Sequence, residues 1–178
     1  MQFQLKHLWH IQDGGEEISF GAGFWFDGPK DLTQVAKDLE EGISICASKF
    51  IAGPRHLKNV LYQASEYWRR GKRLARNPSI DLLMRVLCES QISKAVELSQ
   101  VSFAREIAVF GVSKQMLTLE GVFDALVKVG GKRNDEFLEL TEQKAKFLKK
   151  FHALPKDCNA DQICDLLVEK SALLVFSK

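Results

Sequence analysis

The N-terminal part of the chain alternates between apolar and polar side chains, and no other feature constrains the fold as strongly. The first run places four apolar residues on one face, namely Phe3, Leu5, Trp9 and Ile11. The second run places five on one face, namely Ile18, Phe20, Ala22, Phe24 and Phe26. A period of two is typical of a half-buried strand. Between the runs, Asp13-Gly14-Gly15 supplies residues that tolerate the positive φ of a tight turn. The pattern therefore predicts an antiparallel hairpin.

Helical periodicity dominates the rest of the chain. Gly28-Pro29 is expected to end the hairpin, and one or two further strands are expected, at residues 103–112 and at the shorter run 43–47. About seven helices are expected, at residues 31–41, 54–71, 77–88, 91–98, 118–129, 135–151 and 159–174. An early hairpin with grouped helices predicts an α+β fold, in which helices cover a small, mostly antiparallel sheet.

Length and composition indicate one globular domain over residues 1–178. The apolar fraction is 46% and the charged fraction 27%, which excludes a disordered or collagen-like chain. No apolar run reaches the roughly 20 residues of a membrane span, and no basic segment precedes a long apolar stretch near residue 1. The four cysteines form no C-x-x-C pair. We therefore expect a cytoplasmic protein, or also a nuclear one in a eukaryote, without a membrane partner.

Positive charge is concentrated in residues 49–76. That segment holds eight basic residues and one acid, a net charge of +7, whereas the other residues hold 17 basic and 22 acidic ones, a net charge of −5. Such a segment favours a local site for a polyanion, because Lys and Arg neutralise phosphates and release counterions. A solvated helix face is the alternative. The candidate phosphate contacts are Arg55, Lys58, Arg69, Arg70, Lys72, Arg73 and Arg76, and Tyr62 is the candidate for stacking on a base.

Catalytic and metal-binding motifs are missing from the sequence. It has no nucleophile elbow, Walker motif or H-E-x-x-H, and His56 and His152 stand without a neighbouring ligand motif. We therefore expect no catalytic residue, no metal and no cofactor. An enzyme with an active site scattered along the sequence remains the alternative.

Two segments resemble a known family. One extends from Arg76-Asn77-Pro78-Ser79 to Gln91-Ile92-Ser93-Lys94-Ala95-Val96, and the other is residues 165–174. Together with the helix that begins near His56-Leu57, they are similar to the small KEOPS/EKC subunit family that includes the human PRPK-binding protein. The chain departs from the family at Ser90 and at Gln100-Val101.

The resemblance implies a non-catalytic accessory subunit of KEOPS, the complex that adds a threonylcarbamoyl group to the adenosine beside the anticodon of certain tRNAs. Its implied partners are the KEOPS kinase/ATPase subunit, tRNA through its 3′ CCA end, and the other KEOPS subunits indirectly. Candidates for the kinase-facing surface are Leu82, Met84, Ile92, Leu167 and Leu174, with core packing as the other role open to them. The alternative function is a protein-binding regulator of a kinase with no direct RNA contact.

Overall fold

A computed structural model of the chain describes residues 6–10, 17–113 and 116–176. The strands are β1 (His7–His10), β2 (Ile18–Lys30), β3 (Ile43–Ala47), β4 (Ala104–Ser113) and β5 (Lys132–Arg133). The helices are α1 (Thr33–Asp38), α2 (Pro54–Arg69), α3 (Pro78–Leu87), α4 (Ile92–Leu98), α5 (Met116–Lys128), α6 (Glu142–Phe151) and α7 (Ala160–Leu173). Short 3-10 turns are η1 (Ser48–Phe50), η2 (Val101–Phe103), η3 (Asp135–Leu138) and η4 (Leu174–Phe176). This order confirms the predicted α+β class.

The described strands form one antiparallel sheet in the order β1-β2-β4-β3, with β5 paired to β2. The predicted hairpin is confirmed by the pairing of β1 with β2, in which His7 lies opposite Gly21. Its expected turn, Asp13-Gly14-Gly15, lies outside the described residues. β2 and β4 are the inner strands, so most of the core is built on these two.

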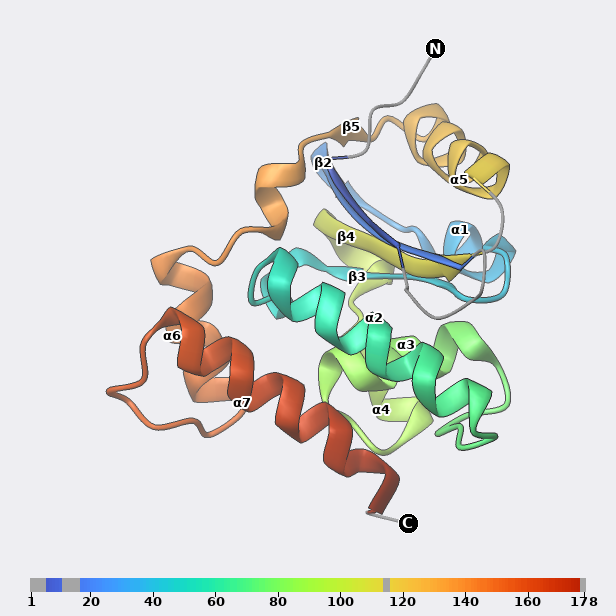
Figure 1. The fold of residues 1–178 in the computed structure, drawn as a ribbon. Helices are drawn as coiled ribbons and strands as arrows, with labels where there is room; N and C mark the ends of the chain where they lie inside the picture. The colour runs from blue at the N-terminus through green and yellow to red at the C-terminus, as the bar shows by residue number, and fades with distance from the viewer. Residues whose placement is uncertain (1–5, 11–16, 114–115, 177–178) are drawn as a thin grey trace.

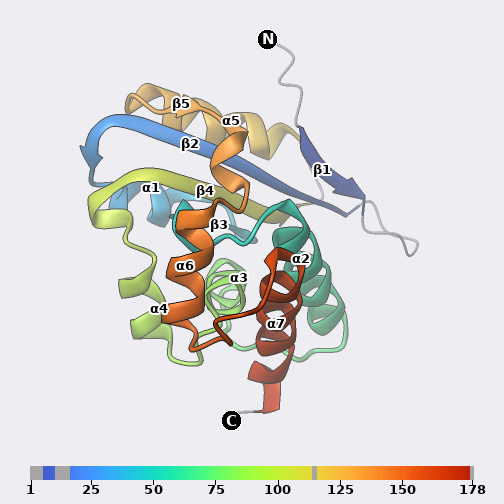
Figure 2. The ribbon, with the colours of Figure 1, turned by 90° about the vertical axis from the view of Figure 1, so that its left-hand side faces the viewer.

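Helices cover both faces of the sheet (Figures 1 and 2). Alternate residues of β2, from Ile18 to Phe26, are buried on the face that α1 and α5 cover. There the ring of Phe123 from α5 lies 5.5 Å from that of Phe24. The period of two therefore placed the larger apolar side chains of β2 correctly.

The opposite face of the sheet supports the larger helical layer. Helices α2, α3, α4, α6 and α7 lie on this side (Figure 2). Here β2 presents small residues, because other chain segments approach it closely. A Cβ on Gly23 would stand 2.3 Å from the carbonyl oxygen of Asn134, and one on Gly21 would stand 3.0 Å from Leu57. These glycines allow the segment before η3 and the helix α2 to pack directly on the strand.

Two expectations about element boundaries are wrong, and one short strand was not expected. β2 continues through Gly28-Pro29 to Lys30, with a register shift between Trp25 and Lys30 that accommodates the proline at the end of the ladder. The single helix expected at 135–151 is two elements, because Thr141 adopts an extended backbone and caps α6 by accepting a hydrogen bond from the Lys144 N–H. The two-residue strand β5 was not expected at all, since it is too short to show a period.

None of the helices in the described ranges combines the length and the apolar character that crossing a membrane requires.

Candidate nucleic-acid interface

The basic candidates lie on α2 and on the chain reversal that follows it. Gly53 has a φ of 96° and turns the chain into the helix, and Pro54 occupies its first turn. The inner face of α2, which includes Leu57, Val60 and Leu61, is buried against the sheet. At the other end Gly71, with a φ of 68°, terminates the helix. The outward face of α2 is therefore fixed by a well-packed inner face.

Three of the predicted residues follow one line on the surface of α2. At 100° per residue, Lys58, Tyr62 and Arg69 fall within about 40° of one another around the helix axis. The rise of 1.5 Å per residue separates Lys58 from Arg69 by about 16 Å along the axis. All three are exposed, and Tyr62 retains 44% of its accessible surface. We call this line the α2 ridge.

The second group lies in residues 70–76, which we call the basic turn. Lys72, Arg73 and Arg76 are exposed, whereas Leu74 and Ala75 between them are buried. The guanidinium carbon of Arg73 lies 5.8 Å from the centre of the Trp68 ring. The turn thus alternates between side chains that anchor it and cations that face the solvent.

Arg55, in the first turn of α2, is exposed but paired with another helix. Its guanidinium contacts two carboxylates of α7, Asp161 at 3.1 Å and Asp165 at 2.6 Å. These ion pairs connect the start of α2 to α7 and neutralise the charge of the Arg55 guanidinium. Arg55 thus joins two helices of the same chain, and its contact with phosphate stays a prediction.

Arg69 and Arg70 share one carboxylate. Both form ion pairs with Glu66 one turn earlier on α2. Five cations from Arg69 to Arg76 against this one acid leave a net charge of +4 at this end of α2. Among the residues that the structure describes, no carboxylate lies within ion-pair distance of Lys58, Lys72 or Arg76. Of the seven predicted cations, these three therefore remain available to a ligand.

The candidates for the kinase-facing surface separate by burial. Leu82, Met84 and Leu167 are 0–1% exposed and pack in the helical core, so they offer no surface to a partner. Core packing, the other role left open for these residues, is therefore the one that their burial supports. Leu174 is 9% exposed, whereas Ile92 on α4 is 50% exposed. Of the five, Ile92 is the one that presents a large accessible surface.

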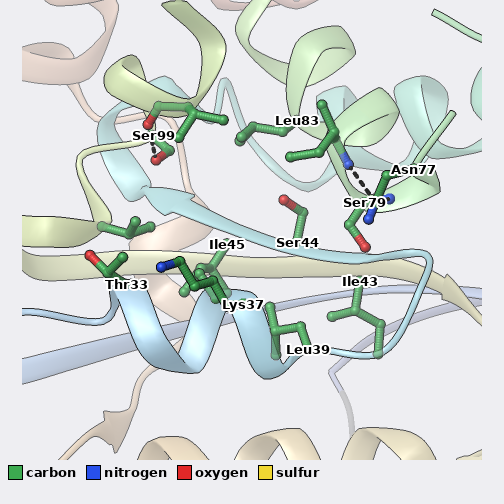
Figure 3. Close-up of a pocket in the computed structure, with 14 residues that line it drawn as sticks. Thr33, Lys37, Leu39, Ile43, Ser44, Ile45, Asn77, Ser79, Leu83 and Ser99 are labelled. Atoms are coloured by element: carbon green, nitrogen blue, oxygen red, sulfur yellow. Dashed lines mark hydrogen bonds between the residues drawn. The ribbon is translucent and has the colours of Figure 1, made fainter. Parts of the chain in front are cut away.

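A pocket of about 320 Å³ opens beside β3, between α1, α3 and α4 (Figure 3). Among the described residues that line it, Lys37 alone is charged. Two of its hydroxyls are used within the protein: that of Ser79 accepts a hydrogen bond from the Gly42 N–H, and that of Ser99 donates to Val96. The walls offer no pair of titratable groups for general acid–base chemistry.

The groups with strongly shifted pKa values lie in the helical core instead. Burial, together with the nearby His152, lowers the pKa of His56 to about 3. Burial lowers the pKa of His152 to about 4, assisted by Lys170. The Nδ1 of His56 accepts a hydrogen bond from the Ala52 N–H, while both Nε2 atoms are buried without a partner among the described residues. Because 96 residues separate the two histidines in the sequence, their proximity could not be predicted from it.

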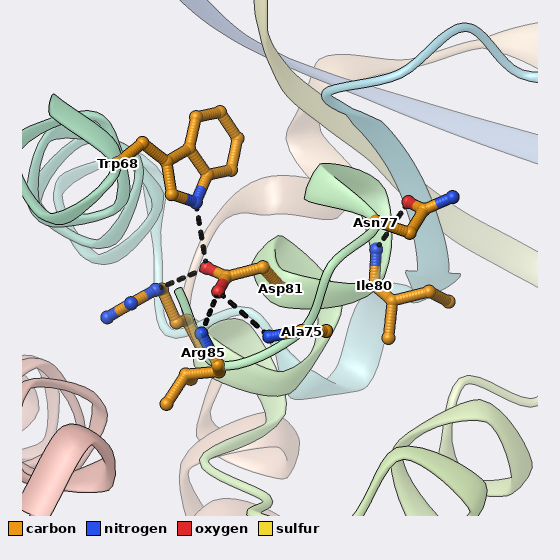
Figure 4. A network of polar contacts seen from close by, with 7 residues as sticks. Trp68, Ala75, Asn77, Ile80, Asp81 and Arg85 are labelled. Carbon is orange, nitrogen blue, oxygen red and sulfur yellow. Dashed lines mark hydrogen bonds and ion pairs between the residues drawn. The ribbon is translucent and has the colours of Figure 1, made fainter. Parts of the chain in front are cut away.

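Sequence reasoning also missed Asp81, which lies at the centre of a buried polar network (Figure 4). Its carboxylate contacts the backbone of the basic turn at Leu74 and Ala75. An acid in the otherwise apolar first half of α3, four residues before Arg85, is the signal that could have identified it.

Within the described parts of the chain, no cluster of three or more His, Cys, Asp or Glu side chains has a geometry that could hold a metal ion. A comparison with known proteins found no matching family model and no matching curated protein.

Proposed function

We propose that this protein is a non-catalytic accessory subunit of a KEOPS-type complex, which binds the kinase/ATPase subunit and helps to recruit tRNA through its 3′ CCA end. The complex and its partners come from the resemblance of residues 76–96 and 165–174 to the small KEOPS/EKC subunits. The observation that carries the RNA-binding part is the exposed positive charge of the α2 ridge and the basic turn.

The chemistry of this surface suits a phosphate backbone. Lys72, Arg73 and Arg76 offer exposed donors within five residues of chain, and Lys58 extends the positive line along α2. Tyr62 stands between Lys58 and Arg69, where its exposed ring can stack on a base while the cations neutralise adjacent phosphates. Guanidinium and ammonium groups bind phosphates of any sequence, so this surface would recognise a tRNA by shape and by an accessible strand.

Salt titration of tRNA binding tests this part of the proposal. The triple variant Lys72→Glu, Arg73→Glu, Arg76→Glu should flatten the plot of log K against log salt by about 2–3 units, since each neutralised phosphate contributes roughly 0.7–0.9. The matched control reverses three cations of α6, Lys146, Lys149 and Lys150, and so changes the net charge by the same −6. A control that flattens the slope equally would refute the site and leave only a general charge effect.

The kinase-binding part is tested at Ile92. Its exposed position on α4 lets Ile92→Glu disturb a protein contact without opening the core. Wild-type protein should retain the kinase subunit in a pull-down, and the variant should lose it. Retention of the kinase by wild-type protein that shows no affinity for tRNA at moderate salt would favour the second function, a protein-binding regulator.

A tRNA without its CCA tail separates the two modes of RNA binding. Weaker binding of the truncated tRNA is the expected result. Equal binding of both tRNAs would confine the contact to the body of the tRNA and contradict the role of the 3′ end.

A further inference from the structure

The Asp81 carboxylate is fully buried and accepts four hydrogen bonds (Figure 4). One oxygen accepts from the backbone N–H groups of Leu74 and Ala75, the second of these at 3.3 Å. The other oxygen accepts from the indole N–H of Trp68 at 3.1 Å and from Nε of Arg85 at 2.6 Å. One side chain thus joins the end of α2, the basic turn and α3.

These contacts determine how the basic turn is folded. The two inward N–H groups fix the backbone at Leu74 and Ala75, directly between Arg73 and Arg76. Because both apolar side chains also point inward, the neighbouring cations are left on the solvent side. A buried carboxylate is stable only when its oxygens are satisfied, so the backbone of the turn and the carboxylate depend on each other.

Arg85 completes the arrangement without adding charge to the surface. It is fully buried, pairs with Asp81 one helical turn earlier, and its guanidinium carbon lies 4.8 Å from the centre of the Tyr67 ring. The two opposite charges balance within the core. The field outside the turn is therefore set by the exposed cations.

We propose that Asp81 is a positioning residue for polyanion binding, which preforms the basic turn so that Lys72, Arg73 and Arg76 meet a phosphate backbone as one set. This inference rests on the proposed function. A turn that visits the competent arrangement only one-tenth of the time would bind about tenfold more weakly, because apparent affinity scales with the competent fraction.

Asp81→Asn tests the inference, since the amide retains one acceptor oxygen and loses the charge that faces Arg85. Amide hydrogen exchange at Leu74 and Ala75 should become at least tenfold faster, and the Kd for tRNA should rise about tenfold, under conditions where circular dichroism shows a fully folded protein. The matched control is Leu167→Ala, which weakens the core and leaves every contact of Asp81 in place. It should leave the Kd for tRNA unchanged at the same temperature, and any faster exchange should be equal at other core amides, with no excess at Leu74 and Ala75.

The outcomes separate this inference from the proposed function. Faster exchange at Leu74 with an unchanged Kd would overturn the positioning role, and so would unchanged exchange. Wild-type protein that binds no tRNA would overturn the proposed function and the positioning role with it, whereas the exchange rates would still report the folding of the turn.

If Asp81→Asn fails to fold, Trp68→Phe replaces it by removing one donor to the same carboxylate. Faster exchange with weaker binding would then support the inference, and wild-type affinity would refute it.

Discussion

Acid should destabilise this protein because two imidazoles are buried in their neutral form. The pKa of His56 is lowered from 6.5 to about 3 by burial and by its neighbour His152, whose own pKa is lowered to about 4. In the unfolded chain both groups take up a proton near pH 6.5. The unfolded state therefore binds more protons below that pH. The two histidines therefore leave the free energy of unfolding unchanged above about pH 6.5. They lower it progressively as the pH falls from there toward their folded-state pKa values.

The size of the effect follows from linkage. Each histidine lowers the free energy of unfolding by up to about 1.4 kcal/mol per pH unit once the unfolded chain is protonated and the folded one is not. Two such groups give a slope of about 2–3 kcal/mol per pH unit between pH 6 and pH 4. A domain of this size has a total stability of about 5–15 kcal/mol, so the loss over two pH units is a large part of it.

Urea unfolding at pH 7, 6, 5 and 4.5, followed by circular dichroism, measures this slope. In the variant His56→Asn, the side-chain oxygen can still accept the hydrogen bond from Ala52, but the group no longer titrates. Its slope should be smaller by about 1.4 kcal/mol per pH unit, whatever its stability at pH 7. His152→Gln should act in the same direction. Variants that keep the wild-type slope would refute the argument that buried neutral imidazoles cause the acid sensitivity.

Two substitution pairs test the packing. Gly23→Ala places a Cβ against the backbone of Asn134 and should lower the free energy of unfolding by about 2–4 kcal/mol, whereas Gly28→Ala, with nothing within 4 Å, should change it by less than about 1 kcal/mol. Equal urea midpoints for the two would contradict the close approach at β2. Leu167→Ala should cost about 2–5 kcal/mol as a buried core residue, and Ile92→Ala less than about 1 kcal/mol because its side chain is half exposed. A larger loss of thermal stability for Ile92→Ala than for Leu167→Ala would contradict the burial of Leu167 and the exposure of Ile92.

The elements that were predictable are those whose periodicity is local and long. Residues 18–26 alternate so regularly that both the strand and its buried face follow from the sequence. The capping box at Asn159 and Gln162 likewise identifies the start of α7, because its two hydrogen bonds are formed within one turn. In contrast, β5 exists only through its pairing with β2 and has no signal of its own.

The basic residues of the candidate site could be located from the sequence, but the partners of their side chains could not. Charge counting located the basic segment, since charge is a property of the residues themselves. It could not show that Arg55 meets two carboxylates more than 100 residues away, or that Asp81 holds the turn from within. Both facts depend on tertiary contacts between segments that are distant in the sequence. The exposed ion pairs of Arg55 add little to stability, about 0–1 kcal/mol each, but they decide where the charge acts.

The carboxylates that α7 brings to Arg55 give helix α2 an electrical asymmetry. One end of the helix is neutralised, and the other end, together with the turn that follows, carries five cations against the single acid Glu66. A highly charged polymer that diffuses toward the molecule experiences a torque as well as an attraction, because the field increases from one end of α2 to the other. The protein would therefore rotate its Lys72–Arg76 end toward such a polymer before the first contact forms.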